Sequence, residues 1–371
     1  MEENFTMAYK KGLQKVEYMW KHLEGFPHIT RNGEWLVNQN GHWTGGFWIG
    51  LLWLDYLEYG DTGVREAARE WTRKLRCRMA DNTTHDQGFI FGPSSVMGNR
   101  IFPSADFVPL IHAGARNMMD LYVKEVGLIQ AWKEEGYQGI SIVDTIMNLP
   151  ILWISDELKG ETEQKEVCQR VARRILECAL RPDGSSYHVV KWDEDFRVYG
   201  DTHQGYSAES CWTRGQAWAL YGFANLYRYT AQEEYLDTAQ KLAKYFYEHL
   251  NKNRLPAWDV TFQDCEEMPV DASAASIAAS GMLLIADLLE QKGESGKAES
   301  LIEQGKKILA AETKLCLYKE MERYGIIRQV TVDYPRGSGI GESAMYGDYY
   351  FMEALFRLKY AGNRDMLRLL Y

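Results

Sequence analysis

The feature that most constrains this sequence is an alternation of two kinds of helix-length segment. In both kinds, apolar residues recur at three- and four-residue spacing, which is the helical period. Segments that are apolar or aromatic almost all round span residues 46–59, 143–158, 211–229, 272–289 and 344–360. Segments with one charged face span residues 64–79, 163–179, 233–250 and 296–311. Helices of the first kind belong inside a protein and those of the second outside. Since strand signals are sparse, we predict an all-α fold.

Turn signals separate the inner segments from the outer segments that follow them. They read Gly60-Asp61-Thr62-Gly63, Lys159-Gly160-Glu161 and Lys292-Gly293-Glu294. Such repetition predicts helical hairpins that bury their apolar faces against neighbouring hairpins, and 371 residues leave room for about six of them in a closed α/α toroid. No Pro/Ser-rich linker or low-complexity tract interrupts the pattern, so we expect one domain over residues 1–371.

In a toroid of this kind, the loops that precede the inner helices line a cup. Three longer stretches, residues 81–103, 181–210 and 254–271, are expected to be irregular, and they contain Gly, Pro, His and Asp residues. Because loops carried by a rigid scaffold often hold functional residues, we expect the site there.

Charge and composition exclude some classes of function. The net charge of −10 disfavours nucleic acid as a partner, because binding to phosphates depends on Lys and Arg. The first ten residues are charged and lack the apolar run of a signal peptide, and we expect no later stretch of transmembrane length. We therefore expect a soluble, cytoplasmic protein. The six cysteines lack CxxC spacing, so neither a zinc site nor a disulfide framework is predicted.

Two aspartates stand in apolar, aromatic surroundings that favour a neutral carboxyl group. Asp144 precedes an apparent helix start at Thr145, and Asp86 follows His85 in what we expect to be a loop with no clear helix after it. Shortage of water would raise a carboxyl pKa toward the range useful for proton transfer. If Asp144 instead caps the helix that follows, its pKa would fall. Asp86 could equally stabilise a turn. The sequence leaves both pairs of interpretations open.

Aromatic and polar residues together predict a sugar-binding surface. The stretch Asn38-Gln39-Asn40-Gly41-His42-Trp43-Thr44-Gly45-Gly46-Phe47-Trp48 turns from polar to aromatic, and its glycines permit close approach of a ligand. A packed aromatic helix entry would give the same pattern. Trp132 is a further candidate for closing the cup, although an isolated Trp usually belongs to a core.

The densest group of polar and aromatic residues runs from Gln204 to Trp218. Arg214 and Trp218 are four residues apart and so share a helix face. A guanidinium beside an indole can bind a carboxylate while the ring stacks on a sugar. Alternatively, Arg214 pairs with Glu209 or another acid inside the bundle. Upstream, His188 and Lys191 add potential cations.

The motifs together resemble a known family. They read His42-Trp43-Thr44-Gly45-Gly46-Phe47-Trp48, His85-Asp86-Gln87-Gly88-Phe89, Asp144-Thr145-Ile146-Met147-Asn148-Leu149-Pro150, Arg214-Gly215-Gln216-Ala217-Trp218 and Tyr346-Gly347-Asp348-Tyr349-Tyr350. In this order the chain resembles the unsaturated glucuronyl hydrolases of glycoside hydrolase family 88. By contrast, the sequence contains no GxSxG, P-loop, GxGxxG or HExxH motif.

This resemblance implies an (α/α)6 barrel that hydrolyses oligosaccharides ending in a Δ4,5-unsaturated uronic acid, with no metal or organic cofactor. It implies that Asp144 is the general acid and base and that Asp86 is its essential partner. The residues that it implies for sugar binding are Trp43, His85, Trp132, His188, Gln204, Arg214, Trp218 and, more weakly, Tyr334. The implied partners are unsaturated uronyl oligosaccharides.

The substrate remains open at this stage. Family members that act on sulfated glycosaminoglycan fragments resemble one another in a Ser- and Lys-bearing loop before the last motif, whereas residues 331–339 here lack the Lys. Arg336 could compensate, but Asp333 would repel sulfate, so we expect unsulfated or differently sulfated fragments. The alternatives are an unsaturated rhamnogalacturonyl hydrolase, a sugar epimerase that uses histidine bases, although only 8 His occur, and a non-catalytic oligosaccharide-binding protein.

Overall fold

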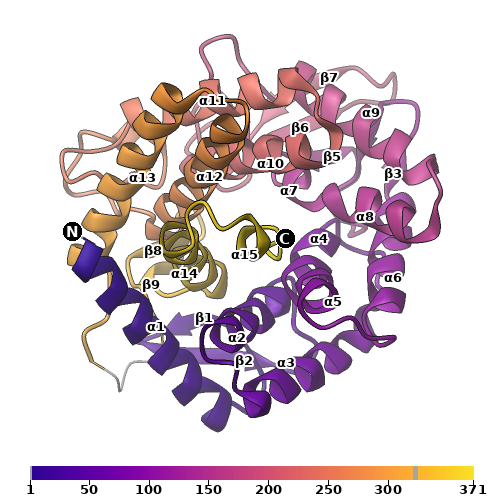
Figure 1. Ribbon diagram of the computed structural model, residues 1–371. Coiled ribbons are helices and arrows are strands. Elements are labelled where there is room, and N and C mark those ends of the chain that lie inside the picture. The colour runs from indigo at the N-terminus through magenta and orange to yellow at the C-terminus, as the bar shows by residue number, and fades with distance from the viewer. Residues whose placement is uncertain (1, 321–324) are drawn as a thin grey trace.

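Helices dominate the computed structural model, which describes residues 2–320 and 325–371, and they surround a common centre in two rings (Figure 1). The longer inner helices are α2 (Gly45–Tyr59), α10 (Thr213–Thr230), α12 (Ala272–Gln291) and α14 (Met345–Lys359). The outer helices are α1 (Glu2–His22), α3 (Thr62–Lys74), α6 (Val108–Met119), α9 (Glu163–Cys178), α11 (Glu233–Glu248) and α13 (Ser295–Leu315). Helices α2 and α3, α10 and α11, and α12 and α13 pack together as hairpins. The prediction of an all-α fold is confirmed.

The inner segment predicted over residues 143–158 is not one helix. It contains α7 (Thr145–Asn148) and α8 (Pro150–Lys159), with Leu149 between them. Pro150 has no N–H to donate to the preceding turn, and its fixed φ suits the first position of a helix. The short helix α7 therefore begins at Thr145 and ends at Asn148, before the proline.

Residues 81–103, predicted to be irregular, are largely helical. They contain α4 (Gln87–Phe91), the π-helical turn η2 (Gly92–Val96) and α5 (Met97–Ile101). The expectation that no helix follows Asp86 is therefore wrong. Close packing explains the error, since a Cβ at Gly88 would lie 2.5 Å from the Asn148 Cα atom. Tertiary contact here outweighs the poor helix propensity of glycine.

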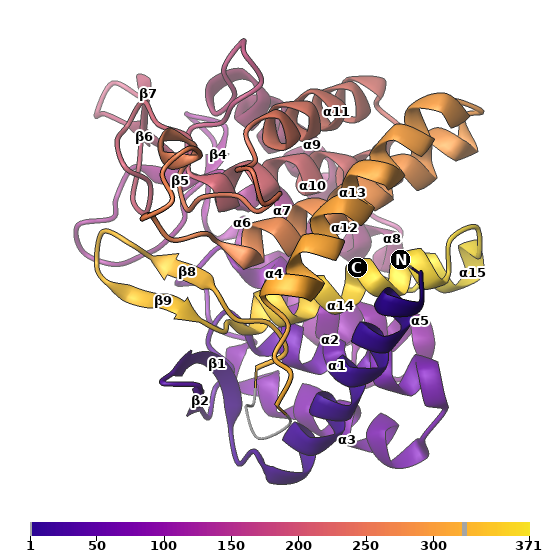
Figure 2. The same ribbon diagram turned by 90° about the vertical axis from the view of Figure 1, so that its left-hand side faces the viewer.

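Short antiparallel strands lie in the connections from outer helices to the following inner helices, at one end of the body (Figure 2). Strands β1 (Phe26–Arg31) and β2 (Glu34–Asn38) form one hairpin, and β3 (Tyr122–Val123) pairs with β4 (Leu128–Ile129). Strands β5 (Ile140–Ile142), β6 (Val189–Trp192) and β7 (Val198–Asp201) form a three-stranded sheet. Strands β8 (Val330–Asp333) and β9 (Ser338–Glu342) form the last hairpin. The short helix α15 (Arg364–Leu367) lies at the opposite end.

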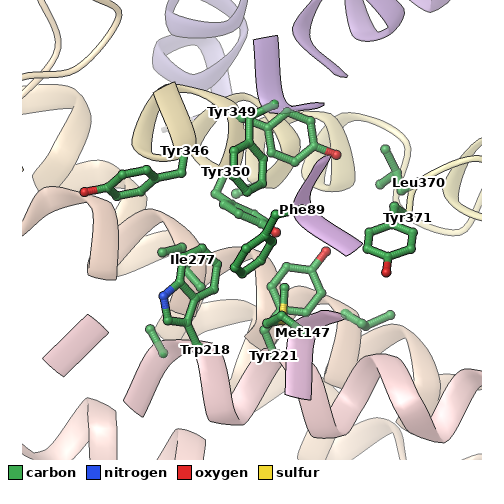
Figure 3. Close-up of a cluster of buried hydrophobic side chains, with 14 of the residues drawn as sticks. Phe89, Met147, Trp218, Tyr221, Ile277, Tyr346, Tyr349, Tyr350, Leu370 and Tyr371 are labelled. Carbon is green, nitrogen blue, oxygen red and sulfur yellow. The ribbon is translucent and has the colours of Figure 1, made fainter. Parts of the chain in front are cut away.

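Aromatic side chains fill the centre, where the inner helices meet (Figure 3). The Phe89 ring centroid lies 4.9 Å from that of Trp218, which in turn lies 5.3 Å from Tyr350. Such tilted and edge-on pairs add to the stability that burial alone provides.

One helix within the described residues, α12, is long and apolar enough to cross a membrane. This corrects the expectation that no stretch reaches that length. In the structure, 94% of its most apolar window is buried against protein.

Candidate active site

A cavity of about 430 Å³ opens at the hairpin end of the helical body. Several of its walls come from residues at the starts of inner helices, including Trp43 before α2, Asp86 before α4 and Asp144 before α7. The predicted site residues that line it are Trp43, His85, Asp86, Trp132, Asp144, Gln204, Arg214 and Trp218. Two predicted residues, His188 and Tyr334, are not among its lining residues.

Asp144 occupies the N-cap position of α7 without acting as a cap. Its φ and ψ are −57° and −22°, which is helical, and its side chain makes no capping hydrogen bond within the described structure. Its buried Oδ1 atom has no hydrogen-bond partner among residues 2–320 and 325–371. The two interpretations left open by the sequence are thereby separated, because the carboxyl group is not bound to the start of its own helix.

Burial raises the pKa of Asp144 from 3.8 to about 7. The Arg214 guanidinium opposes this rise in pKa, and the Asp86 carboxylate adds to it. Removal from water disfavours the ionised form, as does a nearby like charge. Asp144 can therefore carry a proton at neutral pH and release it again.

Asp86 occupies the N-cap position of α4, but its side chain makes no capping hydrogen bond there and instead contacts residues that precede it. The Thr84 hydroxyl donates to Asp86 Oδ2 at 2.5 Å, and His85 Nε2 lies 3.5 Å from Asp86 Oδ1. The Thr84 hydroxyl also accepts the Asp86 backbone N–H at 3.3 Å. Asp86 is 9% exposed, so its carboxylate faces the cavity with little surrounding water.

His85 is fully buried and hydrogen-bonded to the helix that begins after Asp144. Its Nδ1 atom lies 2.9 Å from the Thr145 hydroxyl. Burial lowers the pKa of His85, and Asp86 opposes this. The hydrogen bond to Thr145 fixes the neutral imidazole ring between the start of α7 and Asp86.

Arg214 is tied to the protein by three charge-assisted or carbonyl contacts. Its Nη1 donates to Asp271 Oδ2 at 2.5 Å and to the Thr331 carbonyl at 2.7 Å, and its Nη2 donates to the Val332 carbonyl at 2.6 Å. The acid partner left open by the sequence is therefore Asp271, which also caps α12 through the Ser273 N–H. A guanidinium has five N–H donors and these contacts use three, so Arg214, which lines the cavity, retains donor capacity.

Aromatic rings form two walls of the cavity. Trp43 stacks on Tyr346 at 5.0 Å between centroids. Trp132 stands edge-on to His85 at 6.0 Å and lies 5.6 Å from His203. Trp218 is only 1% exposed, so most of its ring belongs to the core.

His188 and Gln204 hold in place the loop after β7, which contributes His203 and Gln204 to the cavity wall. His188 Nδ1 accepts the backbone N–H groups of His203 and Gln204, both at 3.2 Å. Gln204 Nε2 donates to the Val332 carbonyl at 2.7 Å. Tyr334 instead stacks on Trp258 at 4.6 Å. His188 thus holds residues that line the cavity, whereas Tyr334 packs on a residue outside its lining.

Sequence reasoning missed other residues that line the cavity: His28, Asn40, His42, Arg78, Thr83, Thr84, Glu134, Tyr137, Ile142, His203, Trp212 and Val332. Asn40, His42 and Trp212 lie inside stretches that the sequence singles out, and Thr84 directly precedes the motif that starts at His85, so proximity could have found all four. Tyr137 comes from a loop without a comparable signal, and Val332 lies in strand β8. Among the described residues, no group of three or more His, Cys, Asp or Glu is arranged to hold a metal ion.

No protein-family model matches the chain. The unsaturated glucuronyl hydrolase of Bacillus sp. (strain GL1) is 32% identical over 350 residues, which cover 90% of this chain and 91% of the relative. The unsaturated chondroitin disaccharide hydrolase of Streptococcus pyogenes serotype M1 is 28% identical over 368 residues, which cover 96% of this chain and 91% of that relative. The crystal structure of the unsaturated glucuronyl hydrolase from Bacillus sp. GL1 has a TM-score of 0.90 at 30% identity and 97% coverage of both chains. This chain belongs to the unsaturated glucuronyl hydrolase family.

Proposed function

We propose that this protein is a glycoside hydrolase that releases the terminal Δ4,5-unsaturated uronic acid from oligosaccharides left by polysaccharide lyases. Family membership supports this activity. The observation that carries it in this chain is Asp144, an uncapped carboxyl group in a sugar-sized cavity whose pKa burial raises to about 7.

The reaction begins at the C4=C5 bond, which together with the ring oxygen is a vinyl ether. Asp144 donates its proton to C4, and an oxocarbenium-like centre develops at C5. Water adds to C5 and gives its proton to the Asp144 carboxylate. The C5 hemiketal opens to a ketone and leaves a hemiacetal at C1, which expels the remaining sugar as an alcohol. This differs from ordinary glycosidases, in which two carboxyl groups act at the anomeric carbon.

The other residues of the cavity have supporting roles in this proposal. Asp86 raises the proton affinity of Asp144 and helps to orient the uronic acid ring. Arg214 offers its remaining donor capacity to the substrate carboxylate, which would otherwise be an uncompensated buried charge. Trp43 and Trp132 provide ring faces for the sugars.

We further propose that the helices form six hairpins of an (α/α)6 barrel in one domain over residues 1–371, and that the protein is cytoplasmic. The contacts of α1 with α14, of α6 with α4 and of α8 with α9 support closure of the ring. They supplement the three hairpins already described.

The loop between β8 and β9 lacks the lysine found in family members that act on sulfated fragments, and its one arginine is already paired. Arg336 pairs with Asp333 at 2.7 Å and also donates to the His203 carbonyl at 3.1 Å. Its charge is therefore largely offset by an acid three residues away. This supports unsulfated or differently sulfated substrates.

Loss of the ultraviolet absorbance of the C4=C5 chromophore tests the activity. The panel contains unsaturated disaccharides from hyaluronan, chondroitin, heparin and rhamnogalacturonan, with Asp144→Asn as the inactive control. We expect the native protein to turn over at least one glucuronyl substrate and the Asp144→Asn variant to turn over none. Turnover confined to the rhamnogalacturonan product would make the protein the pectin-acting alternative. Binding without any loss of absorbance would make it an oligosaccharide-binding protein.

A further inference from the structure

The side chain of Tyr371 belongs to the same buried cluster as Phe89 in α4 and Met147 in α7, the helices that follow the two aspartates (Figure 3). It is 4% exposed. A Cβ at Gly88 in α4 would lie 2.6 Å from the Tyr371 hydroxyl, and a Cβ at Gly92 would lie 2.4 Å from its ring. The phenol ring is therefore in direct contact with the helix that starts immediately after Asp86.

Gly88, which Tyr371 contacts, also packs against the helix that starts after Asp144. The Cβ position of Gly88 is 2.5 Å from Asn148 Cα, in the last turn of α7. Asn148 joins the two helices, because its Oδ1 accepts the Phe89 N–H at 2.8 Å and its Nδ2 donates to the Asp144 carbonyl at 3.1 Å. Tyr371 thus supports a junction that connects α4 directly to the main chain of Asp144.

The segment that carries Tyr371 is anchored from the far end of the helical body. Arg100 donates to the Leu370 carbonyl at 2.6 Å, and Arg228 donates to the Leu370 and Tyr371 carbonyls at 3.3 and 3.4 Å. These two arginines line a cavity of about 610 Å³ whose walls also include residues of α12 and α15. The anchoring leaves the Tyr371 ring little freedom to withdraw.

We propose that Tyr371 is a positioning residue, which sets the separation of Asp86 and Asp144 by filling the space against α4 beside the Gly88–Asn148 contact. The proposal rests on the proposed function of these two aspartates. It assigns to the segment after α15 a role at a cavity that it does not touch.

Removal of the ring should loosen the junction without altering any cavity-lining side chain. Water would then reach Asp144 more easily, and Asp86 could move away from it. Both changes lower the proton affinity of Asp144, because its burial and the Asp86 charge are what raise it. Substrate contacts with Trp43 and Trp132 would remain.

The test compares Tyr371→Phe, Tyr371→Leu and Tyr371→Ala with Phe246→Ala, a buried cavity variant on the outer helix α11. For Tyr371→Leu and Tyr371→Ala we expect kcat to fall by at least about tenfold while KM changes by less than about threefold. The basic limb of the pH–rate profile should move to lower pH. Tyr371→Phe keeps the ring and should remain within about threefold of the native kcat. Phe246→Ala should lower stability alone.

All variants are assayed where circular dichroism shows them folded, and Tyr371→Leu serves if Tyr371→Ala does not fold. A folded Tyr371→Leu protein with native kcat and an unmoved basic limb would overturn the proposal, as would an equal loss of kcat in Phe246→Ala. Carboxyl carbon NMR titration of Asp144 provides a readout without turnover. If the native protein hydrolyses nothing, the proposed function fails, whereas an Asp144 pKa lowered in Tyr371→Leu still supports the positioning role.

Discussion

Asp144 and Asp348 lie in two different parts of the molecule, and the pKa of each carboxyl group is raised by a similar amount. Burial raises the pKa of each to about 7. Asp348 is fully buried in α14, where its two oxygens accept the Ile326 and Ile327 N–H groups, both at 2.9 Å. Asp144 faces a cavity, and its buried Oδ1 has no hydrogen-bond partner in the described structure.

The difference shows that a raised pKa alone does not identify an acid that acts on a substrate. Asp348 uses both oxygens to hold a neighbouring segment and does not line the cavity, so it cannot pass a proton to a ligand bound there. Asp144 lacks such bonds and can exchange a proton with a bound ligand. The four predictions below test this contrast.

The largest effect is expected from Asp144→Asn. An amide cannot donate and recover the proton, so kcat should fall by about 10³-fold or more, while substrate binding and the fold persist. Chromophore loss measures turnover, and calorimetric titration with substrate measures binding. Activity retained within about tenfold, which is about 1.4 kcal/mol of barrier, would remove the distinction between the two aspartates.

A smaller loss is expected from Asp86→Asn, of about 10²-fold in kcat. Because the Asp86 carboxylate contributes to the raised pKa of Asp144, its removal should also move the basic limb of the pH–rate profile below its native position near pH 7. The full pH profile of the variant measures this. A lower rate with an unmoved limb would mean that Asp86 acts on the substrate alone.

Asp348→Asn should alter stability rather than catalysis. Its amide nitrogen would face one of two backbone donors, and an unsatisfied buried donor costs about 1–3 kcal/mol. Urea denaturation measures the free energy of unfolding, and kcat is measured on the folded fraction. Loss of kcat in a fully folded variant would contradict the structural role.

The pH dependence of stability should separate the two residues by a smaller amount. Each carboxyl group binds its proton more tightly in the folded state, so the free energy of unfolding should fall as pH rises from about 4 to about 7. Asp144→Asn removes one of these contributions, so its free energy of unfolding relative to that of the native protein should be about 2–3 kcal/mol higher at pH 8 than at pH 5. Denaturation at both pH values measures it. An unchanged difference would show that Asp144 is not held neutral by burial.

Much of the fold can be predicted from the sequence, because the distribution of apolar residues along a helical segment indicates whether that helix is buried on all sides or on one. The predicted inner segment 272–289 corresponds to α12 (Ala272–Gln291), and 163–179 corresponds to α9 (Glu163–Cys178). The helices after Asp86 are not predicted, because Gly88 and Gly92 are poor helix formers. Their close packing against Tyr371, which is far away in the sequence, requires glycine at these positions.

The candidate site is predictable in its residues but not in their pairing. Asp144, Asp86 and Arg214 lie in recognisable motifs, and all three line one cavity. Whether Asp144 caps its helix depends on backbone angles that no residue pattern fixes. The sequence offers Glu209 or another acid inside the bundle as the partner of Arg214, and the structure identifies Asp271, which is 57 residues away. Pairings of this kind arise from the closing of the helical ring.

The attachment of the β8–β9 hairpin has a consequence for how such enzymes diversify. Arg214 and Gln204 hold this hairpin by the main-chain oxygens of residues 331 and 332. Main-chain oxygens are the same whichever amino acid occupies a position. Substitutions can therefore change the side chains of this hairpin, which borders the cavity at Val332, while its attachment to Arg214 and Gln204 is kept.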